Sequence, residues 1–148
     1  MMKPSRKLAV ILLCFGLVMS VRAFVMGRSI DHFHNVYEEA KTFQENGKYE
    51  KAIAGFREAA KLDPTYATVS DRLGDCLFKT KRYDEAFDAY QTVLRKNSGS
   101  SFTFLHLGDI YEMRGDREKA KEFWSRAEES WQGDDWAEQA KIRLKKKP

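Results

Sequence analysis

Histidine and cysteine are the side chains that most readily indicate a nucleophile or a transition-metal site, and this sequence has three His and two Cys. His32 and His34 flank Phe33, but alternate residues of a helix point to different sides, so they do not predict a metal site. His106 has no obvious acidic partner in the sequence. Cys76 has small and apolar neighbours, which predict a buried thiol; a reactive or intermolecular thiol is the alternative. With no phosphate-binding loop, metal-spaced Cys/His set or nucleophile motif, we expect neither catalysis nor a metal or cofactor.

The charge is unevenly distributed along the 148 residues. The chain has 26 basic and 22 acidic residues, but four of the basic ones lie in residues 1–23 and five in 141–148, where there is no acid. Residues 24–140 therefore carry 17 basic against 22 acidic residues, a net charge of −5. An acidic body does not favour nucleic acid, because contacts to phosphates need a basic surface.

Residues 1–23 have the features of a signal peptide. Three basic residues within 1–7 precede 14 apolar or small residues at 8–21. Val21 and Ala23 place small residues at the two positions that a signal peptidase reads, which favours cleavage after Ala23.

An uncleaved membrane anchor at 8–27 is the alternative, since about 20 residues span a bilayer core. Its one charge, Arg22, lies near the end, where the side chain can reach the interface. A buried helix of a soluble protein is a third interpretation. Signal peptide and anchor both leave the basic residues of 1–7 in the cytoplasm. They predict an extracytoplasmic body after residue 28, in the periplasm or an equivalent space, either soluble or anchored.

One pattern recurs at an interval of 34 residues: NGKYEKAIAGF at 46–56, TKRYDEAFDAY at 80–90 and RGDREKAKEFW at 114–124. It divides the chain into three blocks, 33–66, 67–100 and 101–134, without insertions. Each block has two stretches of apolar residues at three-to-four spacing, which predicts two helices. Gly47 and Gly115 fit left-handed helix ends between them, and Lys81 holds the same place in the second block.

Small residues also recur at fixed places in the blocks. The eighth residue is small in every block, and so is the twentieth: Ala40, Gly74 and Gly108, then Ala52, Ala86 and Ala120. Because glycine inside a helix costs about 1 kcal/mol against alanine, its presence predicts a close helix crossing with aromatic rings beside it. One pair cannot bury its apolar faces alone, so stacked pairs are expected.

These residues resemble the tetratricopeptide repeat family. VSDRLGDCL with KRYDEAFDAY, and FLHLGDIY with RGDREKAKEFW, follow the family pattern over residues 33–134. The resemblance implies an all-α, right-handed α-solenoid of three helix pairs. The signal or anchor helix expected from the composition of the N-terminal residues precedes it. Residues 135–148 look like a capping helix with a basic tail, whose cations complement the helix dipole. Binding of this tail to an anionic surface is the alternative.

The resemblance also implies a concave groove lined by the first helix of each pair. The places that face it map to His34, Tyr37, Lys41, Gln44, Thr68, Asp71, Arg72, Asp75, Phe78, Phe102, Leu105, His106, Asp109, Glu112 and Met113. From these we predict ten partner-binding residues: Tyr37, Lys41, Asp71, Arg72, Asp75, Phe78, Phe102, Leu105, Asp109 and Glu112. Chaperone-binding members grip a C-terminal carboxylate with a clamp of Lys, Asn and Arg, and most of that clamp is missing here. Aromatic patches and carboxylates suit instead an apolar segment with basic flanks; a merely solvated face is the alternative.

Two functions fit these observations. The first is a non-catalytic adaptor or assembly factor that binds one or more proteins or peptides. The second is a structural subunit of a larger envelope complex, with Trp124, Trp131 and Trp136 at a permanent interface. In either case, an uncleaved N-terminal segment would also contact the membrane.

Overall fold

The computed structural model describes residues 30–130 and 135–145, and all regular structure within these ranges is α-helical. The chain divides into two compact units, residues 1–35 and 36–148. Of the first unit only 30–35 are described, and they are helical. The predicted signal peptide or anchor and the end of the basic tail lie outside the described residues. Among the described helices, none is both long and apolar enough to cross a membrane.

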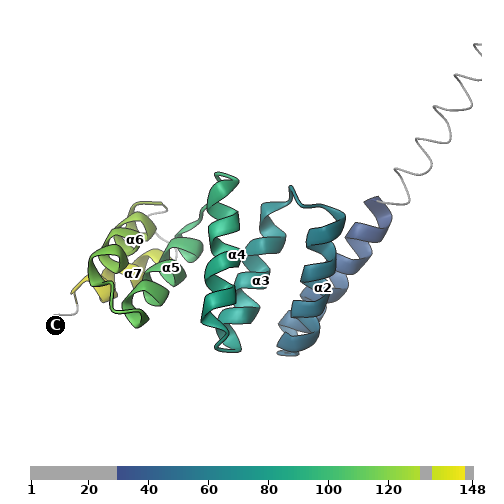
Figure 1. Cartoon of the computed structure of the whole chain (residues 1–148), viewed down its shortest axis with the longest axis horizontal. Coiled ribbons are helices and arrows are strands. Elements are labelled where there is room, and N and C mark those ends of the chain that lie inside the picture. Colours follow the sequence, from purple (N-terminus) through teal and green to yellow (C-terminus); the bar gives the residue numbers. More distant parts are fainter. Residues whose placement is uncertain (1–29, 131–134, 146–148) are drawn as a thin grey trace, which may run out of the picture. The chain divides into compact units, whose positions relative to one another are not determined.

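The second unit contains the helical residues 36–45 and six further helices in chain order (Figure 1). They are α2 (Tyr49–Leu62), α3 (Ala67–Lys79), α4 (Tyr83–Arg95), α5 (Ser101–Met113), α6 (Arg117–Ser130) and α7 (Asp135–Lys145). The all-α prediction is confirmed over the described residues. The boundaries of the blocks themselves stay a prediction.

The turns inside the blocks have the backbone that the sequence predicts. Gly47 and Gly115 have φ of 69° and 80°, and Lys81 adopts φ of 62° despite its side chain. These left-handed residues end each first helix, since the next amide can then bond back into the last turn. One helix start was not predicted: Ser100 and Thr103 form a reciprocal capping box at the beginning of α5.

The small residues lie at close crossings, as predicted. A Cβ added to Gly74 would lie 2.5 Å from the Tyr90 ring, and one added to Gly108 would lie 2.4 Å from the Trp124 ring. Both separations are far shorter than van der Waals contact, so a larger residue would push the paired helices apart. Aromatic rings therefore fill the space that glycine leaves.

The contacts between successive blocks differ in kind. The backbones of α2 and α3 approach closely, and so do those of α6 and α7, whereas α4 and α5 approach less. Aromatic rings span the wider α4–α5 separation: Phe87 meets Tyr111 at 5.5 Å between centroids, and Tyr90 stacks on His106 at 5.9 Å. Packed against α4, α6 and α7, helix α5 is buried on most sides.

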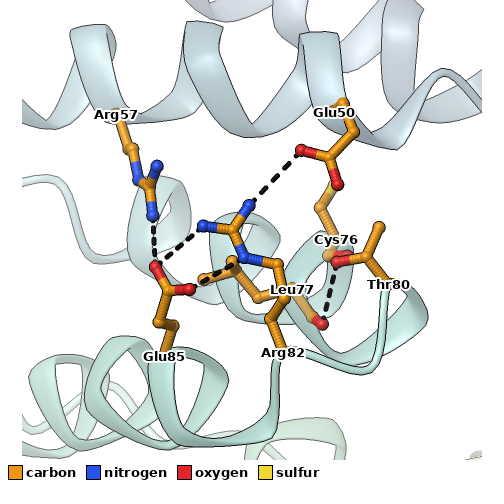
Figure 2. A network of polar contacts seen from close by, with 7 residues as sticks. All are labelled: Glu50, Arg57, Cys76, Leu77, Thr80, Arg82 and Glu85. Carbon is orange, nitrogen blue, oxygen red and sulfur yellow. Dashed lines mark hydrogen bonds and ion pairs between the residues drawn. The ribbon is translucent and has the colours of Figure 1, made fainter.

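A polar network on the surface joins the first two blocks (Figure 2). Arg82 at the start of α4 donates to Glu85 of the same helix and to Glu50 of α2, and Arg57 of α2 donates to Glu85. Arg82 is partly exposed and its partners are more so, so water and salt weaken the pairing. The network orients α2 and α4 but contributes little to stability.

Candidate functional site

A hollow of about 330 Å³ opens beside α3, and we call it the α3 hollow. Its wall comes from four helices: the helix ending at residue 45, α3, α5 and α7. The side chains that line it are Gln44, Thr68, Asp71, Arg72, Asp75, Phe102 and Trp136. Four polar residues of α3 share its wall because places three and four apart fall on one helix face.

Hydrogen bonds fix the polar side chains at the edge of the hollow. The Arg72 guanidinium donates through Nε to the Tyr37 hydroxyl at 2.9 Å and through Nη1 to Gln44 Oε1 at 3.1 Å. Gln44 Nε2 in turn donates to Asp75 Oδ2 at 2.7 Å. Arg72 therefore donates to uncharged oxygens of Tyr37 and Gln44, which belong to the preceding block, and Asp75 accepts from the uncharged Gln44 amide.

Asp71 is a partly buried carboxylate of the hollow. Burial raises the pKa of Asp71, and the charge of Asp75 adds to that rise. The hydrogen bond from the Thr103 hydroxyl (2.7 Å) and, less strongly, the charge of Arg72 oppose it. Burial disfavours the charged form of an acid unless charge or hydrogen bonds compensate it. Because the pKa of Asp71 is raised on balance, these favourable interactions offset only part of the cost of burying the carboxylate.

Two aromatic rings form the other wall. Phe102 and Trp136 meet edge to face with centroids 5.0 Å apart, and Trp136 is 39% exposed. His106 lies behind them, 4.5 Å from Phe102 between ring centroids and 6% exposed. Burial, followed by the charges of Lys79 and Arg143, lowers the pKa of His106 to about 3. His106 is therefore a neutral member of the aromatic cluster.

Four of the ten predicted residues line the α3 hollow: Asp71, Arg72, Asp75 and Phe102. Tyr37 supports it from behind, through its bond with Arg72. Whether any of these residues binds a partner stays a prediction.

Three predicted residues lie outside the α3 hollow but remain partly or fully exposed. Lys41 pairs with Glu38 at 3.4 Å, Phe78 packs on the rings of Tyr83 and His106, and Glu112 is exposed near the end of α5. Only a partner that extended beyond the hollow would reach them.

The placement of Leu105 in the groove is wrong. Its side chain is 1% exposed, because α5 is enclosed by its neighbouring helices. Leu105 holds the same block position as Asp71, yet it belongs to the core.

Asp109 is engaged within the chain. Arg143 of α7 donates to both of its carboxylate oxygens, with Nη2 3.0 Å from Oδ2, and the Trp124 indole donates to Oδ1 at 3.1 Å. Burial raises the pKa of Asp109, and the two bonds from Arg143 oppose that rise. This carboxylate joins α5 to α7 and is not open to a partner in this structure.

Trp136 is the residue of the hollow that sequence reasoning missed. The sequence places Trp136 in the capping helix and, in the alternative function, at a permanent interface, but not in the groove. The signal was present: Thr68, Phe102 and Trp136 stand at intervals of 34 residues, so all three hold the second place of a block. By contrast, Trp124 is 5% exposed in the core, and Trp131 lies outside the described residues.

Comparisons with known proteins agree on one family. Models described as tetratricopeptide repeat match residues 37–101 and 103–131. BBSome complex member BBS4 of Bos taurus is 33% identical over 95 residues, which make up 64% of this chain and 18% of that protein. The chain thus spans less than a fifth of that relative's length.

Solved structures agree on the fold. The Arabidopsis OM64 TPR domain has a TM-score of 0.71 at 16% identity, covering 79% of this chain and 97% of that one. PcrH in complex with the chaperone binding region of PopD has a TM-score of 0.70 at 19% identity, covering 77% and 89%. At such identities the likeness shows the fold alone.

Proposed function

Because this chain belongs to the tetratricopeptide repeat family, we propose that it is a non-catalytic protein-interaction module that holds a segment of a partner protein in the α3 hollow. The observation that carries this proposal is the lining of the hollow, which combines an exposed aromatic corner with hydrogen-bonding groups already fixed in place. Aromatic anchors beside oriented polar groups are typical of binding surfaces. The fold is compatible with the role, since PcrH of similar fold holds a region of PopD.

The chemistry of the described residues favours binding over catalysis. Burial raises the pKa of the Cys76 thiol to about 12, so its nucleophilic thiolate is scarcely populated at neutral pH. His106 is buried with a pKa of about 3 and is not poised to exchange protons there. Within the described ranges, no three His, Cys, Asp or Glu side chains are grouped to hold a metal ion.

The partner is proposed to be extracytoplasmic, in the periplasm or an equivalent space. Support comes from the sequence of residues 1–23, with its basic start, apolar run and small residues before a cleavage point. N-terminal sequencing of the mature protein tests the two forms. A start at Phe24 indicates a soluble processed protein; an intact Met1 together with membrane fractionation indicates the anchored form; an intact Met1 in the cytosol would contradict both.

Site-specific photo-crosslinking in the protein's own cells tests the proposed site. The crosslinking residue replaces Thr68, which is exposed at the hollow, or, as the matched control, Glu122, which is exposed on α6. We expect a defined protein adduct from position 68 that is absent at position 122. Equal adducts at both positions, or none at position 68, would contradict binding at the hollow.

A further inference from the structure

The α3 hollow carries two carboxylates that the protein does not neutralise by pairing. Asp71 and Asp75 lie one turn apart on α3, an arrangement that disfavours two like charges. Across residues 30–130 and 135–145, no basic side chain forms an ion pair with either of them. The one cation in the wall, Arg72, is turned toward Tyr37 and Gln44. With both acids ionised, the lining has a net charge of −1.

The hydrogen bonds to these carboxylates come from neutral groups. Thr103 donates to Asp71 Oδ1, and Gln44 donates to Asp75 Oδ2. Hydrogen bonds between a cation and a carboxylate are shorter and stronger than those from neutral donors. A cation that entered the hollow could therefore form stronger bonds to these carboxylates than Thr103 and Gln44 do. The second oxygen of each carboxylate is where we expect such a cation to bind.

The aromatic corner suits a flat cation. Phe102 and Trp136 meet at an interplanar angle of 78°, so the two rings present surfaces in different directions beside the carboxylates. Positive charge is attracted to the face of an aromatic ring, most strongly to that of Trp. A guanidinium can stack on such a face and donate to a carboxylate in its own plane, which a lysine ammonium cannot.

The same molecule shows this recognition one block further along. Asp109 stands 34 residues after Asp75, at the same block position, and Arg143 of α7 grips it through two parallel bonds. The residue 34 positions after Asp75 is Asp109, whereas the residue 34 positions after Asp109 is Arg143. The place that holds an arginine for Asp109 therefore holds an aspartate for Asp75. The α3 carboxylate therefore lacks the guanidinium that its counterpart in α5 receives.

We propose that the α3 hollow binds an arginine side chain of the partner segment, held by Asp71 and Asp75 against the Phe102–Trp136 corner. This inference rests on the proposed function and specifies its ligand chemistry. A volume of about 330 Å³ is at the low end for small-molecule pockets, of roughly 300–1,000 Å³, and accommodates one long side chain. The polarity is opposite to that of a clamp for a C-terminal carboxylate, so an acidic segment is disfavoured here.

Selection from a random library tests the specificity without knowledge of the natural partner. A phage library of random 12-residue peptides is panned on the full-length chain in detergent micelles, and enriched peptides are then measured by fluorescence anisotropy. The test variant is Asp71→Asn/Asp75→Asn. The matched control is Glu118→Gln/Glu122→Gln, which removes two exposed carboxylates of α6.

We expect the enriched peptides to share an arginine. Replacing that arginine by glutamine, or using the Asp71→Asn/Asp75→Asn protein, should weaken binding by about tenfold to a hundredfold, as for loss of hydrogen bonds to a charged group. Lysine should restore part of the affinity, and the control variant should bind as the unchanged protein does. An Asp75→Arg variant should prefer a peptide in which glutamate replaces the arginine, which a merely structural role of Asp75 would not produce.

Two other outcomes separate this inference from the proposed function. In the first outcome, Trp136→Ser abolishes binding, but the enriched peptides share no arginine or bind the Asp71→Asn/Asp75→Asn protein with unchanged affinity. This outcome would overturn arginine recognition and leave the α3 hollow as a binding site. Peptides that ignore Trp136→Ser as well, or the absence of any enriched peptide, would overturn both proposals.

Discussion

Helices α3 and α5 hold equivalent places in consecutive blocks, yet the polar residues of α3 face an open hollow and those of α5 are covered by other helices. Asp75 of α3 lines an open hollow and receives a neutral amide, whereas Asp109 of α5 is bound by the Arg143 guanidinium and the Trp124 indole. Arg72 likewise borders the hollow, while His106 at the same block position is buried and neutral. The difference shows that the repeat sets where a side chain points, but the next helix decides whether it meets water or protein.

The helix that makes the difference is α7. It packs on α5 and α6, and it brings Arg143 to Asp109 and Trp136 to Phe102. Its sequence also continues the 34-residue spacing, so it acts as the first helix of a fourth block. Because α7 packs beside α5, the polar site at Asp109 is covered by Arg143. The equivalent site at Asp75 of α3, one block earlier, remains open as the α3 hollow.

The largest effect that separates the two helices should come from charging His106. We expect His106→Glu to cost about 4 kcal/mol or to prevent folding, because a buried charge would face Asp109 without a partner. Arg72→Gln should cost only about 1 kcal/mol, since water in the open α3 hollow can replace the two hydrogen bonds that Arg72 makes to Tyr37 and Gln44. Urea unfolding measures both; equal losses would contradict the contrast between open and closed sites.

A smaller loss is expected when the closing cation is removed. Arg143→Met leaves the Asp109 carboxylate, 14% exposed, without its guanidinium. The expected cost is about 2–3 kcal/mol of unfolding free energy. As the matched control, Lys141→Met removes an exposed cation of the same helix and should change stability little. If the two variants were equally stable, the Asp109–Arg143 pair would not hold α7 in place.

The neutral state of His106 predicts a dependence of stability on pH. Its folded pKa of about 3 lies below the unfolded value of 6.5, so the unfolded chain binds the proton first as pH falls. Stability from this group is complete above pH 6.5 and declines down to about pH 3, by about 2 kcal/mol at pH 5. His106→Phe should remove this part of the decline between pH 6.5 and 5. An unchanged slope would show that His106 protonates as readily when folded.

A smaller stability change, of the opposite sign, is expected at Asp71. Its folded pKa is raised, so ionisation opposes folding, and the contribution of this group is lost as pH rises through the raised pKa. We expect Asp71→Asn to raise stability at pH 7 by up to about 1 kcal/mol, since the amide oxygen can still accept from Thr103. Thermal unfolding at pH 4 and 7 checks it; a destabilised variant at pH 7 would mean that the carboxylate is well compensated.

The sequence predicted the features that depend on residues within one block and recur from block to block, namely the helix crossings and the turns. Gly74 and Gly108 indicated the helix crossings, and Gly47 and Gly115 the turns, because glycine at these places has a steric reason visible in one block. The burial of Leu105 and the pairing of Arg143 depend on how a neighbouring helix lies. Arg143 was interpreted through the helix dipole, although its place 34 residues after Asp109 was a signal for the contact. The α3 hollow needed both kinds of information, so only part of its lining was predicted.

The most direct test compares the same substitution at the two equivalent carboxylates, Asp75→Asn and Asp109→Asn. For each variant, urea unfolding gives stability and anisotropy gives affinity for an arginine-bearing peptide from the selection. We predict that Asp75→Asn weakens binding about tenfold with stability unchanged within about 0.5 kcal/mol. Asp109→Asn should lower stability by about 1–2 kcal/mol and leave affinity unchanged under folding conditions. Equal effects of the two variants on binding and on stability would contradict the division between an open and a closed carboxylate.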